Sequence, residues 1–244
     1  MVAAWLSRRA PGWLSPGCRV YAIGDVHGCA DRLWALHEQI AEDLQESPVE
    51  RPLLLHLGDY VDRGPNSADV VRRLAAGPAL LGVPMVCLRG NHEQMLLDAL
   101  EHGSDVGAHW LRNGGDAALK SWGSSGYQSV EEWRAALSAE LPFLRGLALH
   151  HRVDGYVFVH AGLRPGIMLS QQSEEDLLWI REDFLSHTGP ILPDAPGMAV
   201  VHGHTPRKWP DCLGQRVGLD TGAVAGGVLT CGVFENQSLR FLTA

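Results

Sequence analysis

Five short polar clusters in the chain each follow an apolar run, and their side chains are of the kinds that bind divalent cations and phosphate. The clusters read GDVHG at 24–28, GDYVDRG at 58–64, GNHE at 90–93, HAG at 160–162 and HGHT at 202–205. Carboxylates, imidazoles and an amide oxygen together suit a borderline dication such as manganese, iron or zinc, and suit calcium poorly. The candidate chemistry is displacement at a phosphate group held by metal ions.

The cluster at 58–64 is the richest of the five. Asp59 follows the middle one of three predicted strands, and we interpret its carboxylate as shared by two metal ions, because a carboxylate can bridge whereas a neutral imidazole ordinarily does not. Asp62 is predicted to orient a catalytic histidine. Arg63 is predicted to hold a phosphate, since the guanidinium fork matches phosphate oxygens.

Two dications about 3.5–4 Å apart can hold a bridging hydroxide and clamp the oxygens of an in-line displacement. They also make the pocket positive, so that it attracts a phosphate dianion although the formal net charge of the chain is -8. His92, next to the candidate ligand Asn91, could protonate the leaving oxygen. Asp62 could hold that imidazole in the correct tautomer and raise its pKa.

Each cluster taken singly has a simpler explanation, since most histidines are structural or solvated. His202 lies where a strand ends, and it is interpreted either as a group that supports the ligands or as packing. Gly222 is explained by turn chemistry alone. Seven other histidines are interpreted as structural or solvated: His37, His56, His102, His109, His150, His151 and His187. Five clusters in order, each after a strand, make coincidence a poor explanation of the whole set.

The elements that position the clusters begin with strands alternating with helices. Strands are predicted at 19–23, 53–57 and 83–88, with helices at 30–45, at 67–76 and from after Glu93 to about His102. This alternation favours a βαβαβ start with parallel strands and right-handed crossovers. Ligands of such sheets bind at the carboxyl ends of the strands, and the first three clusters lie there.

The remainder of the chain divides into a helical insertion and a second group of strands. Residues 103–142 are predicted to form a small helical cap beside the site, in which the tryptophans are interpreted as packing. A turn at Asp154-Gly155 is predicted to join strands 147–150 and 156–159 as a hairpin, and a short helix is expected over 173–181. Further strands are predicted at 198–201, 216–219, 227–234 and 238–242, and we expect this half to be mostly antiparallel.

Composition limits the class of protein. The chain has 244 residues, 45% of them hydrophobic, which suffices for one domain over 18–244 preceded by an irregular surface arm at 1–17. The acidic balance disfavours nucleic acid as a partner. The five cysteines form no CxxC pair, and no signal peptide or membrane-spanning run is evident. We therefore expect reduced thiols and a cytoplasmic protein with no membrane partner.

The five clusters together resemble those of the PPP-type phosphoprotein phosphatases in the calcineurin-like metallophosphoesterase superfamily. Within it they are most similar to the small bacterial and phage enzymes, such as the phosphatase of bacteriophage lambda. LLWIRED at 177–183, GHTP at 203–206 and DTGAV at 220–224 strengthen the likeness. It runs from about residue 18 to the C-terminus.

The resemblance implies a fold, a cofactor and a set of site residues. The fold is α/β, a four-layer α/β/β/α sandwich with the helical insertion added. Two divalent metal ions are implied, manganese first, with iron or zinc as alternatives. The resemblance implies that the first metal is bound by Asp25, His27 and Asp59, and the second by Asp59, Asn91, His160 and His204. It implies that the phosphate is clamped by Arg63 and Arg181. It also implies that His92 is the general acid, paired with Asp62.

The sequence thus predicts a monomeric, metal-dependent serine/threonine protein phosphatase. Its expected substrates are phosphoproteins or phosphopeptides, with some hydrolysis of phosphotyrosine as well. A metal-bridging hydroxide would attack phosphorus directly, without a phosphoenzyme. One alternative is a hydrolase of dinucleoside polyphosphates such as diadenosine tetraphosphate; enzymes of that kind tend to lack an aspartate at the position of Asp62. The others are a different phosphodiesterase and a non-catalytic scaffold on the same fold.

Overall fold

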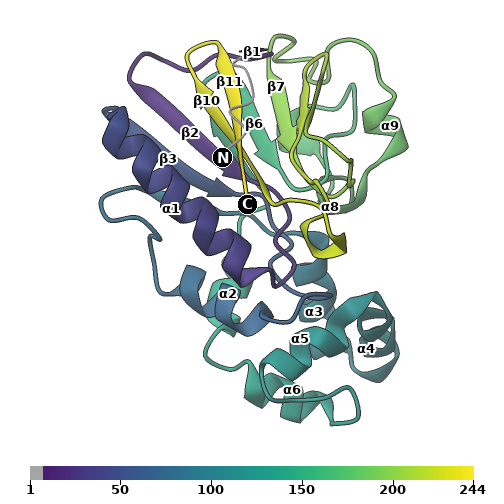
Figure 1. Cartoon of the computed structure of the whole chain (residues 1–244). Coiled ribbons are helices and arrows are strands. Elements are labelled where there is room, and N and C mark those ends of the chain that lie inside the picture. Colours follow the sequence, from purple (N-terminus) through teal and green to yellow (C-terminus); the bar gives the residue numbers. More distant parts are fainter. Residues whose placement is uncertain (1–7) are drawn as a thin grey trace.

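The computed structural model describes residues 8–244 as two β-sheets flanked by helices, with further helices gathered at one end (Figure 1). The elements of the first half are β1 (Arg8–Arg9), β2 (Cys18–Ile23), α1 (Ala30–Glu46), β3 (Arg51–His56), α2 (Ser67–Ala75), β4 (Met85–Cys87) and α3 (Asn91–His102). The helical segment that follows consists of α4 (Ser104–Trp110), the π-helical turn η1 (Leu111–Gly115), α5 (Asp116–Ser121), α6 (Val130–Ala136) and α7 (Leu141–Arg145).

The second half returns to strands with short helices between them. Its elements are β5 (His150–Val153), β6 (Tyr156–Val159), the 3-10 turn η2 (Leu169–Gln171), α8 (Glu174–Trp179), α9 (Glu182–Leu185), β7 (Ala199–His202), β8 (Asp211–Leu213), β9 (Arg216–Gly218), the 3-10 turn η3 (Ala223–Ala225), β10 (Thr230–Glu235) and β11 (Ser238–Thr243). Ser173 caps α8 by accepting a hydrogen bond from the backbone N–H of Asp176 at 3.1 Å.

Both sheets are mixed. The first has the strand order β1-β11-β10-β2-β3-β4, in which β2, β3 and β4 are parallel to one another and β10 and β11 are antiparallel additions. The second has the order β5-β6-β7-β9-β8, with β6, β7 and β9 parallel and an antiparallel strand at each edge. Parallel strands point the same way, so their carboxyl ends meet at one edge of each sheet.

Alternation of side chains along the strands produces the four layers. In β2, Tyr21 and Ile23 pack with the helices, whereas Val20 and Ala22 pack against the second sheet. In β6, residues 156 and 158 face the first sheet and residues 157 and 159 face α8 and α9. Three buried clusters therefore separate helices, sheet, sheet and helices, as the predicted sandwich requires.

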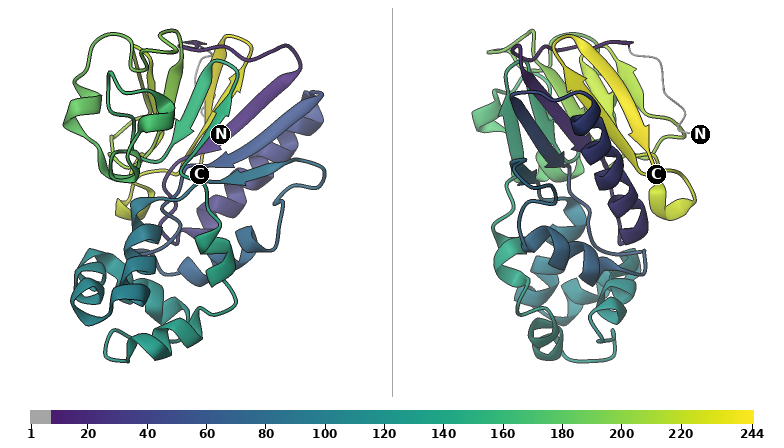
Figure 2. Two further views of the ribbon diagram at one scale, coloured as in Figure 1. Left: turned by 180° about the vertical axis from the view of Figure 1, so that it is seen from behind. Right: turned by 60° about the vertical axis from the view of Figure 1, so that its left-hand side comes forward.

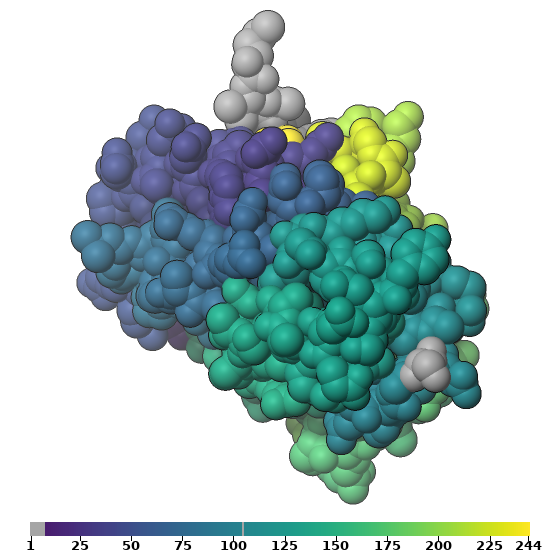
Figure 3. All heavy atoms as spheres, turned by 90° about the horizontal axis from the view of Figure 1, so that it is seen from below, coloured from purple at the N-terminus to yellow at the C-terminus, as the bar shows by residue number. Residues whose placement is uncertain are grey.

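The helical segment from α4 to α7 lies at one end of the sheets. Two further views show it at that end from behind and from the side (Figure 2). Seen from below, this segment, coloured teal, covers much of the face (Figure 3). The helical character of the predicted insertion agrees with the structure. Within residues 8–244 no helix is both long and apolar enough to cross a membrane.

Most strand pairings of the second half are antiparallel, as predicted. The exceptions are β6, β7 and β9, which are parallel; between β6 and β7 the chain crosses over through α8 and α9. Two expectations differ from the structure. The Asp154-Gly155 hairpin forms, but its first strand is β5 rather than residues 147–150. Within the predicted irregular arm, β1 pairs with β11, and Ala10 and Leu14 are buried; the part of that prediction on residues 1–7 lies outside the described residues.

Candidate active site

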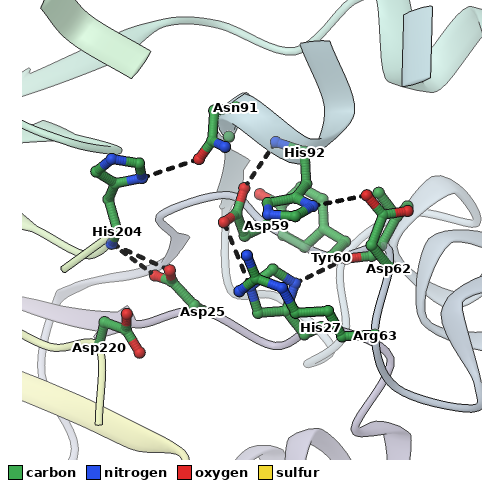
Figure 4. A network of polar contacts seen from close by, with 12 residues as sticks. Asp25, His27, Asp59, Tyr60, Asp62, Arg63, Asn91, His92, His204 and Asp220 are labelled. Atoms are coloured by element: carbon green, nitrogen blue, oxygen red, sulfur yellow. Dashed lines mark hydrogen bonds and ion pairs between the residues drawn. The ribbon is translucent and has the colours of Figure 1, made fainter. Parts of the chain in front are cut away.

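The five polar clusters come together at the carboxyl ends of parallel strands from both sheets. Asp25 follows β2, Asp59 follows β3, Asn91 begins α3, and the last two clusters follow β6 and β7. The candidate ligands are buried, and those that Figure 4 labels point toward one another. Buried polar groups need partners, so such a convergence calls for a bound charged species.

Two groups of side chains could each hold a metal ion, and Asp59 belongs to both. One group consists of His27, Asp59 and His92, and the other of Asp59, His160 and His204; within each group the ligand atoms lie within 4.8 Å of one another. Asp59 Oδ2 lies 3.4 Å from His27 Nε2, and Asp59 Oδ1 lies 3.4 Å from His160 Nε2. The carboxylate therefore faces imidazoles on two sides, as a ligand shared by two cations must.

Asn91 and Asp25 complete the cluster from opposite sides. The amide oxygen of Asn91 lies 2.8 Å from His160 Nε2 and 2.9 Å from His204 Nδ1. Asp25 accepts hydrogen bonds from the backbone N–H of His204 at 3.2 and 3.0 Å, and it is not part of either ligand group. Asp220 lies beside Asp25 (Figure 4).

The electrostatics of the cluster fit a bound cation. Burial lowers the pKa of His27 to about 4 and that of His204 to about 3, so both imidazoles are neutral, which is the form that binds metal. Burial alone would raise the pKa of Asp59, but His160, His92 and His27 hold it below its usual value. Burial, together with Asp220 and Asp59, raises the pKa of Asp25 well above its usual value. A divalent cation would relieve this repulsion between buried carboxylates.

A histidine–aspartate pair lies at the edge of the same cluster. His92 Nδ1 and Asp62 Oδ2 share a hydrogen bond of 2.6 Å, and both side chains are buried. Burial raises the pKa of Asp62 well above its usual value and lowers that of His92. The predicted rise in the pKa of His92 is therefore wrong in direction, because burial outweighs the neighbouring carboxylates. The hydrogen bond between Nδ1 and Asp62 leaves Nε2 as the ring nitrogen that can transfer a proton to a leaving group.

Two arginines border the cluster. Arg63 Nη1 lies 2.9 Å from His27 Nε2, and Arg181 Nε donates to His204 Nε2 at 3.0 Å. Both guanidinium groups are thus next to candidate ligands, where an anion bound by the cations would meet them.

Unusual backbone conformations hold these residues in place. Five of the site residues have positive φ angles between 43° and 73°: His27, Asp59, Asp62, Arg63 and His204. Such conformations are rare for residues with a side chain and persist only where surrounding contacts enforce them. One such contact is the carboxylate of Glu93, which accepts hydrogen bonds from the backbone N–H groups of Gly90, Asp59, Tyr60 and Val61 at 2.7–3.2 Å.

Comparison with known proteins identifies the family to which this geometry belongs. Residues 18–222 match the family described as calcineurin-like phosphoesterase. The chain belongs to the calcineurin-like phosphoesterases. It is thus a metallophosphoesterase, and the family's divalent metal centre agrees with the two ligand groups that share Asp59.

Relatives of this metallophosphoesterase are named either as serine/threonine-protein phosphatases or as bis(5'-nucleosyl)-tetraphosphatases. It is 32% identical over 214 residues to serine/threonine-protein phosphatase 1 of Salmonella typhimurium, covering 86% of this chain and 89% of the relative. It is 30% identical over 226 residues to the asymmetrical bis(5'-nucleosyl)-tetraphosphatase PrpE of Bacillus subtilis, covering 85% of this chain and 87% of the relative. A serine/threonine phosphatase structure from Saccharomyces cerevisiae shares the fold, with a TM-score of 0.59, 17% identity and coverage of 94% and 81%.

The residues predicted for the site of this metallophosphoesterase form one connected network. The links are hydrogen bonds or ion-pair distances. They join Asp59 to His27, His160 and His92, and Asn91 to His160 and His204. The remaining links join His204 to Asp25 and Arg181, His92 to Asp62, and His27 to Arg63. His202 lies outside it. Its ring packs edge-on against Phe184 at 5.1 Å, and its Nε2 has no hydrogen-bond partner among residues 8–244.

Sequence reasoning gave no role to three residues of the metallophosphoesterase site. Glu93 organises the loop at 59–61, Asp220 lies beside Asp25, and Trp110 contacts Asp62 from the helical segment. Glu93 was visible in the GNHE cluster, and Asp220 in DTGAV. Trp110 carries no local signal, because its partner is 48 positions earlier in the chain.

Proposed function

We propose that the protein is a metal-dependent phosphomonoesterase that removes phosphate from phosphoserine and phosphothreonine in proteins, and also accepts phosphotyrosine. The observation that carries this proposal is the His92–Asp62 pair beside a ligand cluster that shares Asp59. Such a pair can protonate the oxygen of the leaving group. The alkoxide of serine or threonine is a poor leaving group and needs this proton, whereas the nucleoside phosphate released from a dinucleoside polyphosphate needs it less.

The proposed centre holds two divalent cations, most suitably manganese, with iron or zinc as alternatives. Asp25, His27 and Asp59 would hold the first cation, and Asp59, Asn91, His160 and His204 the second. When bound, the cations supply an activated water and offset negative charge on the phosphate. Mixed carboxylate, imidazole and amide donors suit this class of metal, and all of these side chains are buried.

The chain's own groups would perform the remaining steps. The guanidinium groups of Arg63 and Arg181 bind the phosphate oxygens and orient the ester, since each lies next to a candidate ligand. His92 delivers its proton to the leaving oxygen, and Asp62 holds its ring. Burial of the pair keeps bulk water away from the transferred proton.

Hydrolysis of a dinucleoside polyphosphate is the second candidate. It is favoured by the similarity to the tetraphosphatase of Bacillus subtilis and by one side chain at the rim. Trp179 is 40% exposed, and its ring lies edge-on to that of His204 at 6.0 Å. An exposed indole beside the metal cluster offers a surface on which a nucleobase could stack.

We further propose that the protein works as a monomer in the cytoplasm, with neither nucleic acid nor membrane as a partner. All five cysteines are free thiols, which fits a reducing compartment. Light scattering measures the molar mass of the purified chain in solution and so tests whether it is a monomer.

The substrate is tested by refilling chelator-stripped protein separately with manganese, iron, zinc and magnesium. Each form is assayed against a phosphoserine peptide, a phosphotyrosine peptide and diadenosine tetraphosphate, with Asp59→Asn as the inactive control. Metal-dependent phosphate release from the phosphoserine peptide, with little dinucleotide cleavage, is expected. Strong dinucleotide cleavage with inert peptides would contradict the protein phosphatase and support the second candidate.

A further inference from the structure

Asp62 is held by two side chains, and one of them comes from the helical segment outside the sheets. The indole N–H of Trp110 donates to Asp62 Oδ1 at 3.0 Å and to Oδ2 at 2.9 Å. Asp62 Oδ2 also accepts the hydrogen bond from His92 Nδ1 at 2.6 Å. All three side chains are buried. The carboxylate is therefore clamped between the imidazole on one side and the indole on the other.

The local structure of the helical segment places this indole closely. Trp110 is the last residue of α4, and the π-helical turn η1 follows it. A Cβ on Gly115 would lie 2.5 Å from the Trp110 ring, so only glycine allows the indole to lie flat against this turn. The ring of Trp133 packs edge-on against Trp110 at 5.8 Å. The indole is thus packed on two sides, by the turn at Gly115 and by the aromatic ring at 133, and phenylalanine at 133 would retain an aromatic ring there.

The same turn also contacts the residue that follows Asp62. The backbone carbonyl of Gly114 accepts a hydrogen bond from the backbone N–H of Arg63 at 3.1 Å. Gly114 has a φ of +108°, and a Cβ there would lie 2.8 Å from Arg63 N and Cγ. The helical segment therefore supports the loop of Asp62 and Arg63 at two successive residues.

A buried tryptophan needs some acceptor for its N–H, but it does not need an ionisable one. Trp133, in the same cluster, satisfies this need with the backbone carbonyl of Ser125 at 2.8 Å. Trp110 instead donates to the carboxylate that holds the proposed acid. Trp122 also donates to a carboxylate, that of Glu140 at 3.3 Å, so what distinguishes Trp110 is that its acceptor is the aspartate bonded to His92.

We propose that Trp110 is a positioning residue, whose indole N–H fixes the Asp62 carboxylate so that His92 is aligned to protonate the leaving group. The proposal rests on the acid role of His92 in the proposed function. It gives the helical segment a part in the chemical step.

The test compares Trp110→Phe with the matched control Trp133→Phe and with His92→Asn. The substrates are phenyl phosphate, whose leaving group needs a proton, and 2,4-dinitrophenyl phosphate, whose leaving group does not. We expect Trp110→Phe to lower kcat about 10- to 100-fold for phenyl phosphate and by less than about threefold for the dinitrophenyl ester, with KM little changed. His92→Asn should show the same pattern more strongly, and Trp133→Phe should not show it.

Equal losses on both esters in Trp110→Phe, or the same pattern in Trp133→Phe, would overturn the positioning role. If His92→Asn shows no dependence on the leaving group, the acid role fails and the role of Trp110 fails with it. If the wild-type protein cleaves the aryl esters but no phosphopeptide, the proposed substrate fails while the role of Trp110 stands.

A measurement without turnover keeps the proposal testable if every variant is inactive. In the metal-free protein, the imidazole N–H that bonds Asp62 should give a low-field proton resonance that is absent in His92→Asn. We expect this resonance to shift or broaden in Trp110→Phe and to be unchanged in Trp133→Phe. An unchanged resonance in Trp110→Phe would overturn the proposal.

Discussion

At the scale of single residues, the site depends on groups whose charge is set by burial. The candidate histidine ligands are neutral because burial lowers their pKa values, whereas Asp59 remains charged because imidazoles surround it. The His92–Asp62 pair is buried and joined by a short hydrogen bond. The groups proposed to bind metal, the neutral histidines and Asp59, therefore lie next to the pair proposed to transfer a proton, His92 and Asp62.

Replacement of His92 by asparagine tests the proposed acid. The amide keeps a polar side chain next to Asp62 but cannot transfer a proton. We expect kcat for a phosphoserine peptide to fall about 100-fold or more and KM to change little, because the lost interaction acts in the transition state. Steady-state kinetics of the metal-loaded protein measure both constants, and an unchanged kcat would remove His92 from the acid role.

At the scale of elements, close approach of loops brings the ligands together. The loop after β3 and the start of α3 touch at Gly90, where a Cβ would lie 2.1 Å from Asp59 Oδ1 and 2.3 Å from Asp59 N. Glu93, one turn into α3, accepts three backbone N–H groups of residues 59–61. The first turn of α3 thus sets the position of the shared carboxylate as well as providing Asn91 and His92.

A methyl group at Gly90 should disturb this contact. Gly90→Ala is expected to displace Asp59 and weaken Mn²⁺ binding at least about tenfold, as measured by calorimetric titration of metal-stripped protein. Gly197→Ala is the control, because a Cβ there meets nothing within 4 Å and the residue does not have a positive φ. Equal Mn²⁺ affinity in both variants would show that the contact at Gly90 does not position the ligand.

The sequence reveals those parts of the site that lie next to a strand in the chain. The clusters at 24–28, 58–64 and 90–93 follow apolar runs, so their meeting could be predicted from the rule for parallel sheets. Trp110 could not be found in this way, because its contact with Asp62 depends on how an inserted helix packs. The parallel pairing of β6 with β7 was missed for a similar reason, since α8 and α9 are too short to indicate a crossover.

At the scale of the whole molecule, the two sheets bury histidines outside the site as well. His37 on α1 and His56 at the end of β3 are buried, and their Nε2 atoms lie 3.0 Å apart. Burial lowers the pKa of His37 to about 4 and that of His56 well below its usual value. These two histidines therefore bind fewer protons in the folded protein than in the unfolded chain in weakly acidic solution.

This difference predicts how stability depends on pH. The unfolded chain protonates His37 near pH 6.5, whereas the folded protein does so near pH 4, so the stabilisation is complete above pH 6.5 and is lost as the pH falls to 4. The free energy of unfolding should fall over this range, and His37→Gln should make the slope shallower by up to about 1.4 kcal/mol per pH unit. Urea unfolding measures the slope. The exposed His102→Gln is the control, and equal slopes in the two variants would contradict the prediction.

We propose that one buried carboxylate, Asp59, joins two cation sites into a single centre. It is tested most directly by equilibrium dialysis of metal-stripped protein against Mn²⁺, with the bound ions counted per chain. Two ions are expected for the wild-type protein and fewer than two for Asp59→Asn, because the variant removes a ligand from both groups. A wild-type chain that binds no ion, or an Asp59→Asn chain that still binds two, would contradict the claim.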